Sequence, residues 1–419
     1  MRISQMFTGV VLSMTSLVAL GADSTGSQKL QNGDYVAVVG DSITEQKQYS
    51  VFIEEYLTMC RPALDLRTTQ FGWSGETSWG FANRMANDML RFHCTVATIN
   101  FGMNDGGYSA ETTEKEKHYH DAYTSVVEQM KKGGVRFIVV GSPGCVDTAR
   151  FHRDPAAAAM YNKTLAAERD IARKIAQEQG VPFADVFNPM MQVMEKTEAK
   201  YGSGYHLAGN DGVHPDANGH LVMAYAYLKS LGCDGDIGTI TVDLAAGKAA
   251  ATEGHAIQSF KDGTVDVQSS RYPFCFFGDD PKSTSSTRGV LEFLPFNADL
   301  NRFTLIVTHA PAGKKVTITW GKQSKTFSVE ELSKGINLAA EFLDNPFSQP
   351  FQQVQQAIRQ QQDFETPLVQ HSIHDLPQYN DEVTVARIVA SLVKKDQSMI
   401  DASNAAVKPV THSIKIEVK

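Results

Sequence analysis

The chain has 419 residues, of which 42% are hydrophobic and 21% charged, so it is long enough for two globular domains. Its formal net charge is −8, and no block of Lys and Arg stands out. Nucleic-acid binding depends on clustered positive charge, so composition argues against that class of function.

The first 22 residues differ from the rest of the chain. Arg2 is their only charged residue, and Met6–Ala22 is apolar with small residues at its end. This pattern is typical of a secretory signal peptide, since the apolar core is too weak for a membrane-spanning helix. We expect residues 1–22 to be a signal peptide and the protein to be secreted or periplasmic, the alternative being a buried N-terminal helix. No later segment is long and apolar enough to span a membrane.

Short apolar runs alternate with helical patterns from residue 35 to about residue 231. The expected strands are Tyr35–Val39, Leu64–Phe71, Val96–Phe101, Val135–Val140 and Val181–Val186. Helical patterns between and after them include Tyr49–Met59, Thr112–Lys132, Ala156–Gln179 and about Asp216–Ser230. Strands separated by helices favour right-handed crossovers and a parallel sheet covered on both faces. We predict a three-layer α/β/α domain over residues 23–234.

The pattern changes after "LGCDGDIG" (residues 231–238). Short alternating runs such as "GTVDVQSS", "GVLEFLPF", "RFTLIVTH" and "KKVTITWG" predict a small antiparallel β-sandwich over residues 235–330. Residues 331–419 are expected to form a helical tail that ends in the strand "HSIKIEVK". Ser328 and Glu331 have the spacing of a capping box at the start of a helix. The glutamine-rich segment reads as an amphipathic helix rather than low-complexity sequence, because apolar residues recur at helical spacing: Phe351, Val354 and Ile358.

Five cysteines match no metal site and no small disulfide framework. They are Cys60, Cys94, Cys145, Cys233 and Cys275. An exported chain can oxidise one or two pairs, but the sequence does not choose among them. None has a neighbouring histidine pattern that favours a nucleophile, so buried hydrophobic roles are the better reading for most of them.

Four polar loops are expected at one edge of the parallel sheet, where ligands bind in such folds. They are "GDS" at residues 40–42, "GWSGET" at 72–77, "GMNDGG" at 102–107 and "DGVHP" at 211–215. Ester hydrolysis needs a nucleophile, a base, a carboxylate that orients the base, and donors for the oxyanion. Ser42, His214, Asp211, the Gly75 N–H and the Asn104 amide together can supply these groups.

These four loops resemble the signature blocks of the SGNH (GDSL-type) hydrolases, in the family's order, over roughly residues 34–230. The resemblance implies a flavodoxin-like fold and a serine esterase with Ser42 as nucleophile, His214 as base and Asp211 as its partner. It also implies an oxyanion hole formed by the N–H groups of Ser42 and Gly75 and by Asn104. Gly72 is an alternative for the glycine of the second block, and the first block has Ile43 where the family pattern has leucine.

Other assignments of the same residues remain open. Ser42 can also cap the following helix or satisfy a turn, and Asn104 can hold a left-handed turn. Ser74 is a rival nucleophile, but "GWSGE" lacks the final glycine of a nucleophile elbow. His220 is expected to pack in the core or face solvent. A role for His206 in lining the active-site pocket is the less favoured interpretation of that residue. Three aromatic residues beside the motifs can stack on a sugar ring, but a role in the core is the more frequent one for such residues: Trp73, Trp79 and Tyr108. The spacing of His118 and His120 places them on different helix faces, which disfavours a metal site.

We therefore expect an exported serine esterase that hydrolyses acyl esters, O-acetyl groups on a carbohydrate above all, with no cofactor and no metal. The expected partner is a small-molecule or glycan ester; no nucleic acid, no membrane span and no particular partner protein is indicated. The alternatives are a lysophospholipase or arylesterase, and a non-catalytic glycan-binding protein. A metal-dependent phosphatase is disfavoured because further ligands at the strand ends are not evident.

Overall fold

A five-stranded parallel sheet forms the centre of the first half of the chain. The computed structural model describes residues 29–419, so the predicted signal peptide at residues 1–22 lies outside the described residues. The strands are β1 (Tyr35–Gly40), β2 (Arg67–Gly72), β3 (Val96–Asn100), β4 (Phe137–Gly141) and β5 (Phe183–Ala184), in the order β2-β1-β3-β4-β5. Every pairing in this sheet is parallel, as predicted.

Helices cover both faces of this sheet. They are α1 (Ser42–Glu45), α2 (Tyr49–Glu55), α3 (Ser78–Asp88), α4 (Thr113–Lys132), α5 (Pro155–Gln179), α6 (Phe187–Tyr201) and α7 (Ala217–Ser230). Along β1, Val36 and Val38 enter a core shared with α2 and α7, whereas Ala37 and Val39 enter one shared with α3 and α4. This alternation follows from the two-residue period of a strand and confirms the three-layer prediction.

The edges of several elements differ from the predictions. Residues Tyr56–Cys60 continue α2 as a π-helix, so the predicted helix is present with a wider last turn. The last strand of the sheet is only two residues long, although a six-residue strand was expected at Val181–Val186. Helices α3 and α6 go beyond those predicted. Thr77 caps α3 by accepting a hydrogen bond from the Gly80 N–H at 3.1 Å.

Two further sheets form the second half of the chain. One contains β6 (Asp236–Asp243), β7 (Lys248–Ala251), β10 (Arg302–Thr308) and β13 (Ile336–Asn337), in the order β13-β10-β6-β7. The other contains β8 (His255–Lys261), β9 (Thr264–Ser269), β11 (Lys315–Trp320), β12 (Gln323–Ser328) and β14 (Val410–Val418), in the order β12-β11-β14-β9-β8. The pairings are antiparallel, as expected, except that β6 and β10 run parallel.

The prediction of a strand at "GVLEFLPF" is wrong. Residues Arg288–Val290 form a 3₁₀ turn, and α8 (Phe296–Leu300) follows. Both Leu294 and Phe296 are buried, and the Phe296 ring packs against Phe274 at a centroid distance of 5.0 Å. A compact turn places these side chains in the core without a partner strand. Tertiary packing determines this conformation, and the local alternation of apolar residues does not reveal it.

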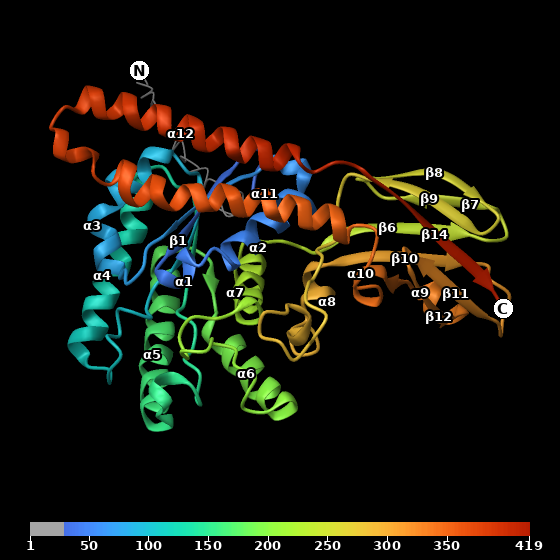
Figure 1. The fold of residues 1–419 in the computed structure, drawn as a ribbon, viewed down its shortest axis with the longest axis horizontal. Helices are drawn as coiled ribbons and strands as arrows, with labels where there is room; N and C mark the ends of the chain where they lie inside the picture. The colour runs from blue at the N-terminus through green and yellow to red at the C-terminus, as the bar shows by residue number, and fades with distance from the viewer. Residues whose placement is uncertain (1–28) are drawn as a thin grey trace, which may run out of the picture.

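The helical tail folds back onto the α/β domain. It contains α9 (Val329–Lys334), α10 (Leu338–Glu341), α11 (Ser348–Pro367) and α12 (Glu382–Ala405). Figure 1 shows α11 and α12 side by side across the α/β domain, with the two smaller sheets at one end of the molecule. The Gln70 N–H of edge strand β2 donates to Glu365 of α11 at 2.8 Å. The tail therefore covers a sheet edge that would otherwise be open for pairing.

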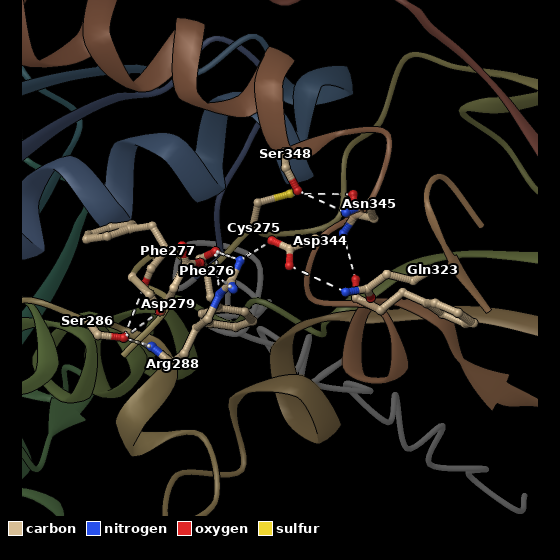
Figure 2. Close-up of polar contacts among 12 residues, drawn as sticks. Cys275, Phe276, Phe277, Asp279, Ser286, Arg288, Gln323, Asp344, Asn345 and Ser348 are labelled. Atoms are coloured by element: carbon tan, nitrogen blue, oxygen red, sulfur yellow. Dashed lines mark hydrogen bonds and ion pairs between the residues drawn. The ribbon is translucent and has the colours of Figure 1, made fainter. Parts of the chain in front are cut away.

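Arg288 joins three segments of the second half. Its guanidinium lies between Asp279 and Asp344, at 3.2 and 2.5 Å, as Figure 2 shows. The Gln323 amide donates to the second oxygen of Asp344 at 3.4 Å. The Arg288 side chain is only 15% exposed, whereas both carboxylates face solvent, so these ion pairs link the loop after β9 to the turn before α11 at the surface.

Two sequence expectations concern single features of the chain. Within residues 29–419, no helix has both the length and the apolar character needed to cross a bilayer. The five cysteines are all buried and all free. Burial raises the pKa of the Cys60 and Cys233 thiols, which keeps them protonated.

Candidate active site

Ser42 lies directly beyond the carboxyl end of the central strand β1. Asp41 caps α1 by accepting a hydrogen bond from the Ile43 N–H at 2.9 Å, and Ser42 is the first residue of that short helix. Gly40 makes the sharp turn possible, because a Cβ there would collide with the side chain of Thr44 and the carbonyl of Asn100. The Ser42 N–H belongs to the first turn of α1 and has no carbonyl partner within the helix.

Ser42, His214 and Asp211 form one chain of hydrogen bonds. The Ser42 Oγ lies 2.8 Å from His214 Nε2, and His214 Nδ1 lies 2.6 Å from Asp211 Oδ2. The sheet brings together two loops that are more than 160 residues apart in the sequence. This contact could not be derived from spacing alone, whereas the contact between Asp211 and His214 was expected from their separation of three residues.

The environment of Asp211 determines how the imidazole is protonated. Partial burial acts to raise the pKa of Asp211, but hydrogen bonds from the backbone and side chain of His214 and from the Val213 N–H hold it below its usual value. The carboxylate is therefore ionised at neutral pH and accepts the Nδ1 proton of His214. The Nε2 lone pair then faces the Ser42 hydroxyl, which is the arrangement that general-base catalysis requires.

A neighbouring loop holds the segment that carries Asp211 and His214. The Asp147 N–H donates to the Gly212 carbonyl at 2.9 Å. Gly212 has φ +84°, and a Cβ at this position would collide with the backbone of Phe151. Glycine is thus required between Asp211 and His214 both for its backbone conformation and for this close approach.

The second loop, which contacts Gly40 through the Trp73 N–H, presents a backbone donor. Gly75 has φ +74° in a turn closed by the hydrogen bond from the Glu76 N–H to the Trp73 carbonyl at 3.1 Å. Its own N–H has no acceptor in the part of the chain that the structure describes. The Gly72 N–H, by contrast, donates to the Gln70 side chain at 2.9 Å. Of the two glycines that the sequence left open, Gly75 has the available donor.

The third loop places Asn104 beside the second. The Asn104 Nδ2 donates to the Glu76 carbonyl at 3.0 Å, and its Oδ1 accepts from the Tyr108 hydroxyl at 3.0 Å. A primary amide has two N–H groups, so one donor remains for a substrate oxygen. Ser74 lies on the same rim, where its N–H donates to Glu45 Oε2 at 2.5 Å, but no histidine accepts from its side chain in the described structure.

Asp105 is a site residue to which the sequence reasoning assigned no role. Its carboxylate accepts hydrogen bonds from the Ser78 N–H, the Ser78 hydroxyl and the Gly102 N–H, at 2.9, 2.5 and 3.0 Å. Burial raises the pKa of Asp105, although these donors oppose the shift. The one sequence signal for this role was the position of Asp105 directly after Asn104 in "GMND". A carboxylate that is withdrawn from solvent at such a place needs several hydrogen-bond donors.

The remaining histidines lie outside the chain of hydrogen bonds. His220 is buried, and burial lowers its pKa to about 3. It accepts from the Tyr49 N–H at 3.2 Å and donates through Nε2 to Gln46 at 3.1 Å. His206 lies beside Asp216, with a closest separation of 3.8 Å. The pair His118 and His120 lies on α4; His120 contacts Glu178, and nowhere in residues 29–419 do three or more ligand side chains gather as a metal site requires.

The aromatic residues near the loops divide into two groups. The Trp73 ring packs between the Arg84 guanidinium and the His374 ring, at 4.5 and 4.9 Å from its centroid. Trp79 and Tyr108 are exposed, at 57% and 38%. Tyr108 is therefore the aromatic side chain that is both accessible and hydrogen-bonded to a predicted site residue.

Comparisons with known proteins place this site in a family context. Residues 38–222 match the model of the GDSL-like lipase/acylhydrolase family. An acetylxylan esterase from Geobacillus stearothermophilus is 23% identical over 227 residues, which cover 49% of this chain and 96% of the relative. The crystal structure of that acetylxylan esterase covers the same 49% of this chain and 97% of its own, with 22% identity and a TM-score of 0.40.

A further structure resembles nearly the whole chain. A gut microbial diltiazem-metabolizing enzyme aligns over 94% of this chain and 100% of its own length, with a TM-score of 0.72 and 22% identity. At this level of identity the likeness shows the fold. The α/β domain, the two smaller sheets and the tail thus occur together in another protein.

Proposed function

Because residues 38–222 form a GDSL-like lipase/acylhydrolase domain and the protein is an ester hydrolase of that family, we propose that it removes O-acetyl groups from a carbohydrate with Ser42 as nucleophile. The observation that carries the catalytic assignment is the chain of hydrogen bonds from Ser42 through His214 to Asp211. The similarity to an acetylxylan esterase supports acetylated saccharides as the substrate class. The apolar segment at residues 1–22 supports export.

The proposed reaction has two half-reactions. In the first, His214 Nε2 takes the hydroxyl proton as Ser42 Oγ attacks the acyl carbon, and the N–H groups of Gly75 and Ser42 with the Asn104 amide stabilise the oxyanion. His214 then donates the proton to the leaving sugar hydroxyl, which leaves an acetyl ester on Ser42. In the second, a water molecule loses its proton to His214 and attacks the acetyl carbon. The bond between this carbon and Ser42 Oγ then breaks, His214 returns the proton to Ser42 Oγ, and acetate is released. Asp211 stays ionised throughout and stabilises the imidazolium.

The test is the loss of turnover in the variant Ser42→Ala. We expect its kcat for p-nitrophenyl acetate and for acetylated xylo-oligosaccharides to fall by at least about a thousandfold with the fold retained. The matched control is Ser74→Ala, which removes the rival hydroxyl and should keep activity. Undiminished turnover in Ser42→Ala would overturn the nucleophile assignment.

The dependence of turnover on acyl-chain length tests the proposed substrate class. Turnover of p-nitrophenyl esters of increasing chain length should be highest for acetyl, because a sugar O-acetyl esterase needs no long acyl site. A maximum at long chains would instead favour a lysophospholipase. Recovery of protein that starts near residue 23 from the periplasm or medium checks export.

A further inference from the structure

A cavity of about 450 Å³ opens beside the loop that carries Asp211 and His214. Six residues line it: Ala149, Arg150, Arg153, Ser203, Gly204 and Asn210. They come from two connections, one between β4 and α5 and the other between α6 and α7. The cavity lies at the same carboxyl-terminal side of the sheet as the candidate active site, and neither the catalytic groups nor the oxyanion donors are part of it.

The cavity is in direct structural contact with the catalytic loop. Asn210, one of its lining residues, immediately precedes Asp211. The backbone of Gly212 packs against the backbone of Phe151, which follows Arg150. The hydrogen bond from the Asp147 N–H to the Gly212 carbonyl at 2.9 Å fixes the two connections to each other. A group bound in the cavity would therefore lie beside the loop that carries Asp211 and His214.

The charged side chains that line this cavity are all positive. Two of its six lining residues are arginines and none is acidic. Over residues 29–419, neither the Arg150 nor the Arg153 guanidinium has an ion pair or a hydrogen bond, whereas Arg169 and Arg288 each bind two carboxylates. The acidic neighbour Asp147 accepts through Oδ1 from the backbone N–H groups of Ala149 and Arg150, at 2.9 and 3.0 Å, and its buried Oδ2 has no partner in residues 29–419. Within the described part of the chain, the two guanidinium groups thus keep their donors available for a ligand.

The backbone next to these arginines adopts the left-handed conformation, which residues with a Cβ rarely adopt. His152 has φ +50° and Arg153 has φ +54°, so two consecutive residues other than glycine lie in the left-handed region. Such residues cost about 1 kcal/mol or more each and persist where the surrounding structure determines them, which is frequent at ligand sites. The packing of Phe151 against Gly212 and Tyr161 holds this turn.

Tyr108 provides an aromatic surface between the candidate oxyanion hole and this cavity. Its hydroxyl donates to Asn104, and its ring stacks on Phe151 with a centroid distance of 6.2 Å and an interplanar angle of 19°. The ring is 38% exposed. A sugar ring that packs on the exposed part of Tyr108 would lie beside Asn104 and beside the segment that carries Arg150, since Phe151 is the neighbour of Arg150.

From this geometry we propose that Arg150 and Arg153 form a subsite for an anionic group on the alcohol part of the ester, so that the preferred substrate is an acetylated acidic saccharide. The proposal rests on the proposed function and adds to it the charge class of the sugar. A guanidinium binds carboxylate and sulfate oxygens through paired N–H groups. A uronic-acid carboxylate and a sugar sulfate ester share this chemistry, and the experiment separates them.

The experiment compares acetate release from three acetylated oligosaccharides of equal length: one neutral, one with uronic-acid units and one with sulfate esters. At low ionic strength we expect kcat/KM to be about tenfold or more higher for an anionic substrate than for the neutral one. In the double variant R150Q/R153Q the ratio of anionic to neutral kcat/KM should fall to about one. The variant R150K/R153K should keep part of the preference because it retains the charge.

The matched control is Arg173→Gln, which removes an exposed arginine of α5 that pairs with Asp170 on the surface. This variant should keep the full ratio. Equal kcat/KM for the three substrates in the wild-type protein would overturn the subsite while leaving the esterase assignment in place. A ratio that persists in R150Q/R153Q would also overturn it. No acetate release from any of the three would overturn the carbohydrate proposal and the subsite together.

A second measurement covers the case in which the double variant does not fold. Inhibition of p-nitrophenyl acetate turnover by the wild-type protein is measured with galacturonate, galactose 6-sulfate and galactose. We expect at least one of the anionic sugars to inhibit at about tenfold lower concentration than galactose. Equal inhibition by the three sugars, or none by any of them, would contradict the subsite.

Discussion

The partly buried carboxylate of Asp105 accepts three hydrogen bonds, and they come from two different segments. Ser78 contributes its N–H and its hydroxyl from the start of α3, and Gly102 contributes its N–H from the end of β3. Asn104 precedes Asp105 and binds the Glu76 carbonyl of the second loop. Asp105 therefore sets the distance between the two loops that carry the proposed oxyanion donors.

The variant Asp105→Asn should lower kcat for p-nitrophenyl acetate by about tenfold or more, with a smaller change in KM. An amide places N–H groups where the carboxylate accepts, so one of the three donors loses its partner and Asn104 shifts; displacements of 1 Å at a site cost up to about 10²-fold. The free energy of unfolding should fall by about 1–3 kcal/mol.

The control for this prediction is Ser78→Ala, which removes one donor and leaves the carboxylate and both backbone N–H bonds. Its kcat should lie between those of the wild-type protein and Asp105→Asn. If Asp105→Asn changes only the stability and leaves kcat intact, Asp105 has no positioning role.

At the scale of elements, the last strand of the chain, β14, starts at Val410 and completes a sheet whose first strand starts at His255. Strand β14 lies between β9 and β11, so its side chains contact both. A buried chain of hydrogen bonds crosses these strands: the Trp320 N–H donates to His412 at 3.1 Å, His412 to Ser269 at 3.0 Å, Ser269 to His255 at 2.8 Å, and His255 to the Ile237 carbonyl at 3.0 Å. The direction follows from its two ends, an indole that only donates and a carbonyl that only accepts.

The variant Ser269→Ala should lower the free energy of unfolding by about 2–4 kcal/mol, measured by urea denaturation. It leaves the His412 N–H without an acceptor and the His255 nitrogen without a donor in a buried place, and each such group costs about 1–3 kcal/mol. Both imidazoles are neutral, because burial lowers the pKa of His412 to about 3 and also lowers that of His255.

The matched control is Ser324→Ala on β12, where an exposed hydroxyl contacts Thr319 at 2.7 Å. Its effect should stay within about 0.5 kcal/mol, as for other surface changes. Equal effects of the two variants would show that the buried chain of hydrogen bonds contributes nothing specific.

At the scale of the whole molecule, the tail is attached to the α/β domain through buried carboxyl groups. Asp396 of α12 accepts from the hydroxyls of Tyr35 and Thr69, both at 3.1 Å, and Glu365 of α11 accepts from the Gln70 N–H. Glu54 of α2 completes the group by accepting from two glutamines of α11. Burial raises the pKa of Glu54 to about 8 and that of Asp396 to about 6, and it raises the pKa of Glu365 as well.

The variant Asp396→Asn should be more stable than the wild-type protein at pH 7 and nearly equal to it near pH 4. Between the unfolded pKa of about 3.9 and the folded pKa of about 6, the folded state binds more protons, so the free energy of unfolding falls as pH rises through this window. The amide removes this loss, which is on the order of 1–3 kcal/mol. Urea denaturation at several pH values measures it.

The control is Asp401→Asn, which changes an exposed carboxylate of the same helix that faces Arg67. Its effect on the free energy of unfolding should be small at every pH, since exposed ion pairs contribute about 0–1 kcal/mol. A pH profile of Asp396→Asn that runs parallel to the wild-type profile would exclude Asp396 as the titrating group.

The predictions from the sequence succeed where the local pattern is compatible with only one type of secondary structure. Alternation of apolar strands and helices indicated the parallel sheet, and the Ser328–Glu331 spacing indicated a capping box that the structure contains. They fail where two patterns compete: "GVLEFLPF" alternates well enough for a strand, yet its side chains reach the core from a 3₁₀ turn and α8. Long-range packing decided that segment, and no short window of sequence contains this information.

The sequence by itself determined the order of the four loops, the residue types in them, and the local contact between Asp211 and His214, because each of these depends on neighbours a few residues apart. Only the tertiary structure decided that Asp105 ties two loops together and that β14 lies in the middle of a sheet. It also decided, within residues 29–419, which glycine N–H has no acceptor and that two arginines without an ion pair line a cavity beside Asp211. These features depend on distances between segments far apart along the chain, which are established when the hydrophobic faces of the sheet and helices pack together.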